Sequence, residues 1–165
     1  MTAEPSGSRV GWGFDSHRLD GSPPLLLGGV NVSDSIGVSA TSDGDVLAHA
    51  VMDAIFGACS LGDLGHHFPS DDPDLGGADS MDLLERTVTM ANRSGWRVSH
   101  VDATVIAESV RVAPFRQEIR DRLGGVLRLE EQSVSVKATT TDGLGFIGRG
   151  EGLAVVAVVT VSPLP

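Results

Sequence analysis

The segment Arg9-Val-Gly-Trp-Gly-Phe-Asp-Ser-His17 combines a strand pattern with two candidate metal ligands. Large apolar side chains alternate with glycines, which predicts a strand over residues 9–17. Asp15 and His17 are two residues apart, so a strand projects both side chains from the same face. The intervening glycines leave room for another part of the chain to approach closely. The segment therefore predicts a carboxylate and an imidazole placed to share one cation.

A third candidate ligand, His49, lies in Ser42-Asp-Gly-Asp-Val-Leu-Ala-His49, a pattern typical of the start of a helix. One Asp and two His from separate elements suit a zinc site that keeps one position open for substrate. A polar strand end with a solvated histidine is the first alternative, because such Asp-x-His triplets also arise by chance. An iron oxygenase with two His and one carboxylate is the second, but it would need a barrel of many short strands.

Composition indicates an acidic protein with one domain. The chain has 165 residues, of which 41% are apolar, and a net charge of −10 that argues against a nucleic acid partner. No apolar stretch reaches the roughly 20 residues that span a bilayer, so no membrane partner is expected. Cys59 is the single cysteine, which favours a reducing compartment. Residues 1–8 lack the features of a secretory signal, so we expect a disordered start and a cytoplasmic protein.

Strand-like and helix-like segments alternate along the rest of the chain. Apolar periodicity predicts helices over 45–61, 78–94 and 114–123, and strands over 9–17, 24–28, 98–107, 134–139 and 153–161. The last strand is almost continuously apolar, so we expect it to be buried on both faces. The stretch 62–77 is predicted to be a long loop. The fold class is an α/β (α+β) sandwich, a single domain over 9–162 with helices packed on one face of a mixed sheet.

Three further segments could contact a phosphorylated ligand. Ser42 or Asp43 can cap the helix that carries His49, whose free N–H groups would also favour phosphate. Lys137-Ala-Thr-Thr-Thr-Asp-Gly143 follows a strand, and its hydroxyls, amides and carboxylate could hold a diphosphate and a hard cation. A Thr-rich strand followed by a flexible turn is the alternative there. The carboxylates of the loop 62–73 suit sugar hydroxyls, although most acidic loops are only solvated.

Taken together, these motifs resemble the 2-C-methyl-D-erythritol 2,4-cyclodiphosphate synthase family, from about Arg9 to Val161. The matching motifs are Gly13-Phe-Asp-Ser-His17, Ser42-Asp-Gly-Asp45 with Ala48-His49, Gly62-Asp-Leu-Gly65, Gly77-Ala-Asp-Ser80, Lys137-Ala-Thr-Thr-Thr141 and Gly148-Arg-Gly-Glu-Gly152. The resemblance implies a phosphorus-oxygen lyase of non-mevalonate isoprenoid biosynthesis. Such an enzyme converts 4-diphosphocytidyl-2-C-methyl-D-erythritol 2-phosphate to the 2,4-cyclodiphosphate and CMP by metal-assisted intramolecular phosphoryl transfer.

The resemblance also implies roles for individual residues. Asp15, His17 and His49 would bind Zn²⁺ or another divalent transition metal, and Asp142 would bind Mg²⁺ or Mn²⁺. Thr41 and Thr140 would act in catalysis. The partners would be a cytidine-diphosphate-linked substrate and two further copies of the chain in a homotrimer, with Phe146 and Arg149 near a central cavity on the three-fold axis. The expected substrate-binding residues are Asp15, His17, Thr41, Ser42, Asp63, Leu64, Gly65, Phe68, Pro69, Ser70, Asp71, Asp72, Ala107, Glu108, Ser109, Val110, Arg111, Val112, Ala113, Thr139, Thr140, Thr141, Asp142, Phe146 and Arg149.

Three positions depart from the family pattern. Thr41 stands where many members have His, Asp142 where Glu is frequent, and Ser70 where a carboxylate is common. The Thr41 departure leaves open a non-catalytic alternative, a zinc-stabilised trimeric module that binds cytidine nucleotides without turnover. We expect the main chain near Thr41 to supply the stabilisation that a histidine would give.

Overall fold

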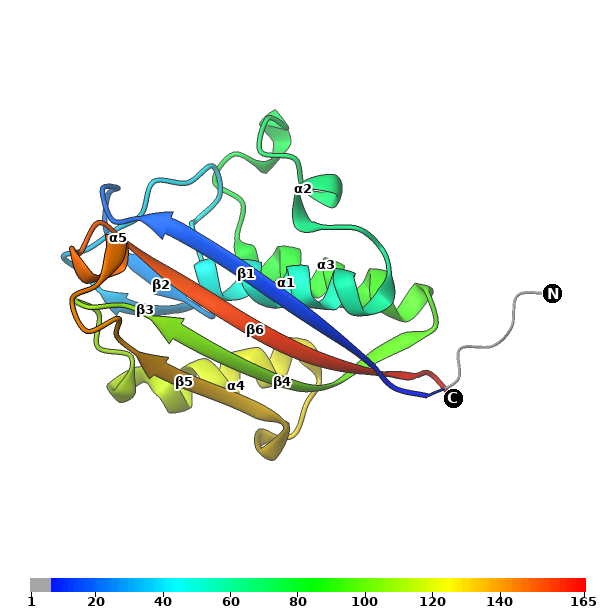
Figure 1. Cartoon of the computed structure of the whole chain (residues 1–165). Coiled ribbons are helices and arrows are strands. Elements are labelled where there is room, and N and C mark those ends of the chain that lie inside the picture. Colours follow the sequence, from blue (N-terminus) through cyan, green and yellow to red (C-terminus); the bar gives the residue numbers. More distant parts are fainter. Residues whose placement is uncertain (1–6) are drawn as a thin grey trace.

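The computed structural model describes residues 7–165, so most of the expected disordered start at 1–8 lies outside the described residues. In the described part, one open mixed sheet has the order β1-β6-β4-β5, with β4 and β5 parallel and the other neighbours antiparallel. Its strands are β1 (Arg9–Arg18), β4 (Trp96–Ile106), β5 (Val134–Thr139) and β6 (Gly152–Pro163). The helices that cover one face are α1 (Val46–Cys59), α3 (Ser80–Arg93) and α4 (Arg116–Leu127) (Figure 1). The predicted α/β sandwich is confirmed.

The close packing of α1 on β1 follows from two glycines of the first strand. Gly11 and Gly13 alternate with Trp12 and Phe14 and face α1. A methyl group on Gly11 would overlap the carbonyl oxygen of Ala54, and one on Gly13 would overlap that of Ala50. The strand and the helix backbone therefore touch directly, as the glycine spacing predicted. This contact brings His49 of α1 next to the end of β1.

A two-stranded hairpin lies apart from the main sheet and is anchored by a buried carboxylate. It consists of β2 (Leu25–Leu27) and β3 (Val30–Ser33), of which only the first strand was predicted. Its turn, Gly28-Gly29, has positive φ angles of 59° and 73°. Their N–H groups donate to Asp45 at 2.9 and 2.6 Å, and Leu47 and Ala48 of α1 donate to the same carboxylate. Asp45 thereby joins the hairpin to the start of α1.

The capping prediction for α1 is consequently wrong. Asp45 is the N-cap, rather than Ser42 or Asp43, and it is fully buried. Burial raises the pKa of the Asp45 carboxyl, while the hydrogen bonds from the N–H groups of Ala48, Gly29 and Gly28 act in the opposite direction. Because this carboxylate already accepts two N–H groups of the first turn, the N-terminus of α1 is not the open phosphate site that the sequence suggested.

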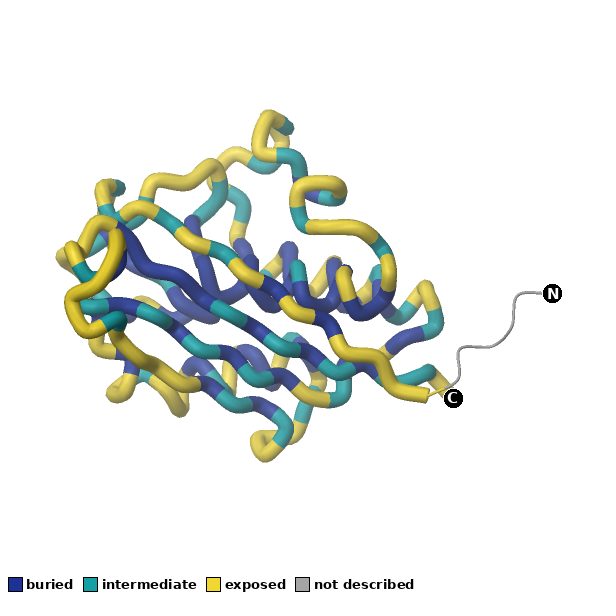
Figure 2. Tube along the Cα trace, in the orientation of Figure 1, coloured by how far each residue is buried: buried dark blue, intermediate teal, exposed yellow. Residues whose placement is uncertain are grey.

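The uncovered face of the sheet is only partly buried, and it is apolar along β1 and β6. From Val155 onward, residues of β6 alternate between buried and half-buried, so the expectation that this strand is buried on both faces is wrong for the single chain (Figure 2). On the neighbouring edge strand β1, Val10, Trp12 and Phe14 are exposed by 68%, 62% and 46%. The rings of Trp12 and Phe14 stack with their centroids 6.2 Å apart. An apolar strip of this kind marks an interaction surface more often than a solvated one.

The connections contain short helices that the sequence did not indicate. The predicted loop 62–77 holds α2 (Leu64–His67) and the 3-10 turn η1 (Pro73–Leu75). Further turns are η2 (Ala113–Phe115), η3 (Glu131–Ser133) and α5 (Gly145–Gly148). Pro114 lies in η2, so α4 begins later and extends further than the predicted helix 114–123. Within residues 7–165, each helix is too short or too polar to cross a membrane.

Candidate active site

Asp15, His17 and His49 form a compact cluster where β1 ends against α1. Asp15 Oδ2 lies 3.2 Å from His17 Nε2 and 3.0 Å from His49 Nδ1, and the two ring nitrogens are 3.4 Å apart. One ligand atom from each residue lies within 4.8 Å of the others. His49 is buried, whereas Asp15 and His17 are partly open to solvent. The two elements thus bring together a carboxylate and two imidazoles that can bind a metal.

The protonation chemistry of the cluster fits a divalent cation. Burial raises the pKa of Asp15, but its hydrogen bonds with His17 and His49 and their positive charge outweigh this and lower that pKa to about 2. The hydrogen bond with Asp15 in turn raises the pKa of His17. An ionised carboxylate facing two imidazole nitrogens needs a cation among them, either a proton or a metal. Two nitrogens and one oxygen are a donor set that zinc and similar transition metals accept.

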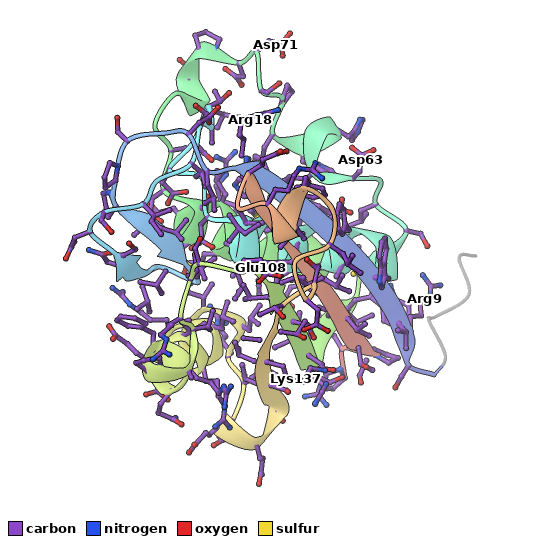
Figure 3. All side chains as sticks on the ribbon, turned by 60° about the vertical axis from the view of Figure 1, so that its left-hand side comes forward. Arg9, Arg18, Asp63, Asp71, Glu108 and Lys137 are labelled. Carbon is purple, nitrogen blue, oxygen red and sulfur yellow. The ribbon has the colours of Figure 1, made fainter. Side chains whose placement is uncertain are left out.

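A cavity of about 270 Å³ opens in front of this cluster. Besides the three ligands, expected substrate-binding residues line it, namely Thr41, Ser42, Leu64, Gly65, Phe68, Pro69 and Ser70. Three carboxylates expected from the segment 62–73, namely Asp63, Asp71 and Asp72, lie outside its lining. Asp63 and Asp72 cap α2 and η1 with their side chains, and Asp71 is exposed (Figure 3).

A second cavity, of about 410 Å³, lies at the carboxyl ends of β4 and β5. Among the residues described, it shares no lining residue with the first. The expected substrate-binding residues that line it are Ala107, Glu108, Val110, Arg111, Val112, Ala113, Thr139 and Thr140. Ser109, Thr141 and Asp142 do not line it. A single chain therefore presents the predicted site as two separate halves.

The loop after β5 carries the second candidate metal ligand. Asp142 is exposed in a left-handed conformation with φ of 52°, and its N–H donates to Thr140 Oγ1 at 3.2 Å. The Glu108 carboxylate holds this loop, accepting from Thr141 N–H at 2.9 Å, Thr141 Oγ1 at 3.2 Å and Gly143 N–H at 3.2 Å. The hydrogen bond from Gly143 N–H has the largest effect on the pKa of Glu108, and that from Thr141 N–H has the next largest. Together they hold this pKa below its usual range. Glu108 is thus a structural clamp as well as a cavity residue.

Phe146 and Arg149 belong to neither cavity. Phe146 lies in α5 and is 43% exposed, and Arg149 pairs with Glu151 at 2.7 Å.

Sequence reasoning missed one contact of the cluster. Ser80 is fully buried, and its hydroxyl lies 3.0 Å from His49 Nε2 and against the carboxylate of Asp43. The motif Gly77-Ala-Asp-Ser80 matched the family but gave no reason to connect it with His49, which is 31 residues away. Asp53, four residues after His49 on α1, accepts from Leu64 N–H at 3.1 Å and so connects α1 to α2.

The chain combines a mixed sheet under one helical layer with a cluster of two histidines and one carboxylate beside a cavity. These features define a metal-binding α+β protein of the enzyme type. The open sheet, with β1 and β5 at its edges, excludes the barrel that the iron oxygenase alternative required. The chain belongs to the YgbB family, whose sequence model matches residues 8–162.

Named relatives agree with this assignment. The 2-C-methyl-D-erythritol 2,4-cyclodiphosphate synthase of Shewanella loihica is 48% identical over 157 residues, covering 95% of this chain and 98% of the relative. The synthase of Shewanella halifaxensis is 50% identical over 151 residues, which cover 92% of this chain and 95% of the relative. The chain superimposes on the bifunctional IspDF of Campylobacter jejuni with a TM-score of 0.94 at 41% identity, covering 97% of this chain but only 44% of that one. The CDP complex of IspF from Plasmodium falciparum gives 0.83 at 30% identity, covering 96% and 98%.

Proposed function

We propose that the chain is a 2-C-methyl-D-erythritol 2,4-cyclodiphosphate synthase of non-mevalonate isoprenoid biosynthesis. In this reaction an oxygen of the substrate 2-phosphate attacks the β-phosphorus of the cytidine diphosphate. The bond from the β-phosphorus to the oxygen bridging it to the α-phosphorus breaks, and CMP leaves. The observation that carries the proposal is the Asp15, His17 and His49 cluster at a cavity that Ser42, Leu64 and Gly65 of the family motifs also line.

The residues present suit a reaction that depends on positioning and charge. Asp15, His17 and His49 would hold Zn²⁺ or another divalent transition metal, and Asp142 would hold Mg²⁺ or Mn²⁺. Such metals supply neutralisation of phosphate charge and alignment of phosphate oxygens. The Thr140 hydroxyl would donate to a phosphate oxygen, and Thr41 would contact the reacting phosphates from the other cavity. No protein nucleophile is required, because the attacking group belongs to the substrate.

The two cavities would bind different parts of the substrate. The cavity beside the cluster suits the erythritol phosphate through Ser42, Phe68, Pro69 and Ser70, with the ribose at Asp63, Leu64 and Gly65. Backbone groups of Ala107–Ala113 would read the cytosine, and Arg111 could reach a phosphate. The CDP bound to the Plasmodium falciparum relative supports a cytidine-linked substrate.

We further propose a homotrimer located in the cytoplasm. The separation of the two cavities supports an active site that combines Asp15, His17 and His49 of one copy with Thr139–Asp142 of the next. The exposed strip of Val10, Trp12 and Phe14 offers an apolar surface for such an assembly. Phe146 and Arg149 would then lie near the three-fold axis. The single, buried thiol of Cys59 favours a reducing compartment.

Incubation with 4-diphosphocytidyl-2-C-methyl-D-erythritol 2-phosphate tests the proposal directly. Phosphorus NMR should show CMP and the cyclic diphosphate appearing together in the presence of Zn²⁺ and Mg²⁺. The His49→Ala variant should lose most bound zinc, measured by atomic absorption, and most turnover. Nucleotide binding without CMP release would favour the non-catalytic module instead. Full zinc retention by His49→Ala would contradict the metal site.

A further inference from the structure

The second ring nitrogen of His49 faces a buried serine that contacts a carboxylate. His49 Nε2 lies 3.0 Å from Ser80 Oγ. The hydroxyl of Ser80 contacts Asp43 Oδ1, and the backbone N–H of Ser80 donates to Asp43 Oδ2 at 2.9 Å. Ser80, the first residue of α3, is fully buried. Three elements are thus connected in a line: the helix that carries His49, the start of α3 and the loop before α1.

The donors available in this line fix the position of one hydrogen atom. Asp43 Oδ1 also accepts from Asp45 N–H at 3.2 Å, so both of its oxygens act as acceptors, as expected of a carboxylate. Ser80 has one hydroxyl hydrogen, and the Asp43 carboxylate can only accept it, whereas the ring nitrogen of His49 can either donate or accept. The hydroxyl therefore donates to Asp43, and its oxygen is left to accept from His49. This direction places a hydrogen on Nε2 of His49.

With a hydrogen on Nε2, the neutral ring presents a lone pair at Nδ1. That nitrogen faces Asp15 Oδ2 at 3.0 Å and His17 Nε2 at 3.4 Å. We propose that Ser80 and Asp43 are positioning residues that fix the tautomer and orientation of His49 so that Nδ1 binds a divalent metal with Asp15 and His17. The inference rests on the metal site of the proposed function. Outer partners of this type commonly change metal affinity roughly 10- to 100-fold.

Ser42 provides a natural comparison for this role. Its Oγ lies 3.2 Å from the same nitrogen of His49 and accepts from Gly44 N–H at 3.2 Å. Among residues 7–165, no carboxylate accepts its hydroxyl hydrogen, so Ser42 can either donate to His49 or accept from it. It therefore does not select a tautomer, although it lies at a similar distance.

The test measures Zn²⁺ affinity of the full chain by competition with a chromophoric chelator at a fixed pH. Ser80→Ala and Asp43→Asn should each weaken affinity by roughly 10- to 100-fold, and Ser42→Ala by less than about threefold. The double variant Ser80→Ala/Asp43→Asn should be little weaker than Ser80→Ala alone, because both changes act through one contact line. Unchanged affinity in Ser80→Ala, or an equal loss in Ser42→Ala, would overturn the proposal.

Two further measurements separate positioning from a purely structural role. The absorption spectrum of the Co²⁺-substituted protein should change in Ser80→Ala, since the orientation of one ligand changes. Melting temperatures of the metal-free variants report the stability of the fold alone. If Ser80→Ala had a lower melting temperature but kept the Zn²⁺ affinity and the Co²⁺ spectrum of the parent protein, the inference would also be overturned. If Asp43→Asn fails to fold, Ser80→Ala decides the question, because it keeps the N–H bond to Asp43. A parent protein that binds Zn²⁺ without releasing CMP would contradict only the proposed function.

Discussion

Thr41 lies in the first cavity and is exposed, at a position where the family resemblance implies histidine. The sequence suggested that main-chain N–H groups at the start of α1 could replace the histidine. The structure weakens that interpretation, because Asp45 already accepts the N–H groups of Leu47 and Ala48. The side chain at position 41 therefore has more to contribute than we expected from the sequence.

We accordingly predict that Thr41→His raises turnover by about tenfold, equivalent to about 1.4 kcal/mol of barrier. An imidazolium can stabilise developing negative charge, whereas a hydroxyl can only donate a hydrogen bond. The gain should fade as pH rises past about 6.5, where free histidine loses its charge. Steady-state CMP release measured from about one pH unit below to about two pH units above the histidine pKa of about 6.5 checks this prediction. An unchanged rate throughout would restore the main-chain interpretation.

At the scale of elements, the contact between β1 and α1 positions the metal ligands. We predict that Gly13→Ala lowers stability by roughly 1–3 kcal/mol, because the added methyl group would overlap the Ala50 carbonyl oxygen. It should also lower zinc content by moving His49 away from Asp15. Chemical denaturation and metal analysis measure the two effects.

Gly57→Ala is the matched control, on the helix α1 that Gly13 contacts. The nearest atom to its added methyl group is Trp12 O at 4.0 Å, and alanine favours the helix by roughly 0.5–1 kcal/mol over glycine. This variant should keep its zinc and be at least as stable as the parent. Equal losses in both variants would show that the glycine contact does not position the site.

The clamp between Glu108 and the loop after β5 gives a second prediction for an element. Glu108→Ala removes the acceptor for the N–H groups of Thr141 and Gly143, so the loop that carries Asp142 should lose its order. We expect turnover to fall about tenfold or more, about 1.4 kcal/mol, with little change in melting temperature. Glu118→Ala, at an exposed position of α4, is the control. Equal turnover in the two variants would contradict the clamp.

The same clamp has a defined dependence on pH. The pKa of Glu108 is lowered in the folded protein, mainly by the hydrogen bond from Gly143 N–H. The ionised carboxylate therefore stabilises the fold above the ordinary glutamate pKa of about 4.3, and this stabilisation is lost as the pH falls below that value.

Local periodicity accounts for the parts of the molecule that the sequence predicted well. Alternation in β1 placed Asp15 and His17 on one face, and the glycines between its apolar residues indicated the close approach of α1. The contacts of Asp45 and Ser80 could not be predicted in this way. Their partners at Gly28, Gly29 and Asp43 are 16 to 37 residues distant, and only the tertiary fold brings them together.

At the scale of the whole molecule, the burial of β6 depends on what covers each face of the sheet, which the sequence of the strand does not specify. Its apolar run predicted burial on both faces, but the single chain covers only the face under the helices. The proposed trimer would account for the other face. We predict that Trp12→Glu, which places a charge in the exposed apolar strip, dissociates the assembly to folded monomers.

Analytical ultracentrifugation and circular dichroism measure assembly and fold in this variant. Trp12 is 62% exposed, so its replacement should leave the core of the chain intact. Arg93→Glu, at an exposed position on the helical face, should remain trimeric. A trimeric Trp12→Glu variant, or a parent protein that is active as a monomer, would contradict the proposed assembly.

The division of the substrate residues between two cavities has a genetic consequence. If each active site combines the first cavity of one chain with the second cavity of its neighbour, a chain with one damaged cavity disables one site of a mixed trimer. A chain damaged in both cavities disables two. Alleles affecting one cavity each, such as His49→Ala and Thr140→Ala, should therefore complement one another when co-expressed. The double allele should instead be dominant-negative, because it inactivates sites that normal chains help to form.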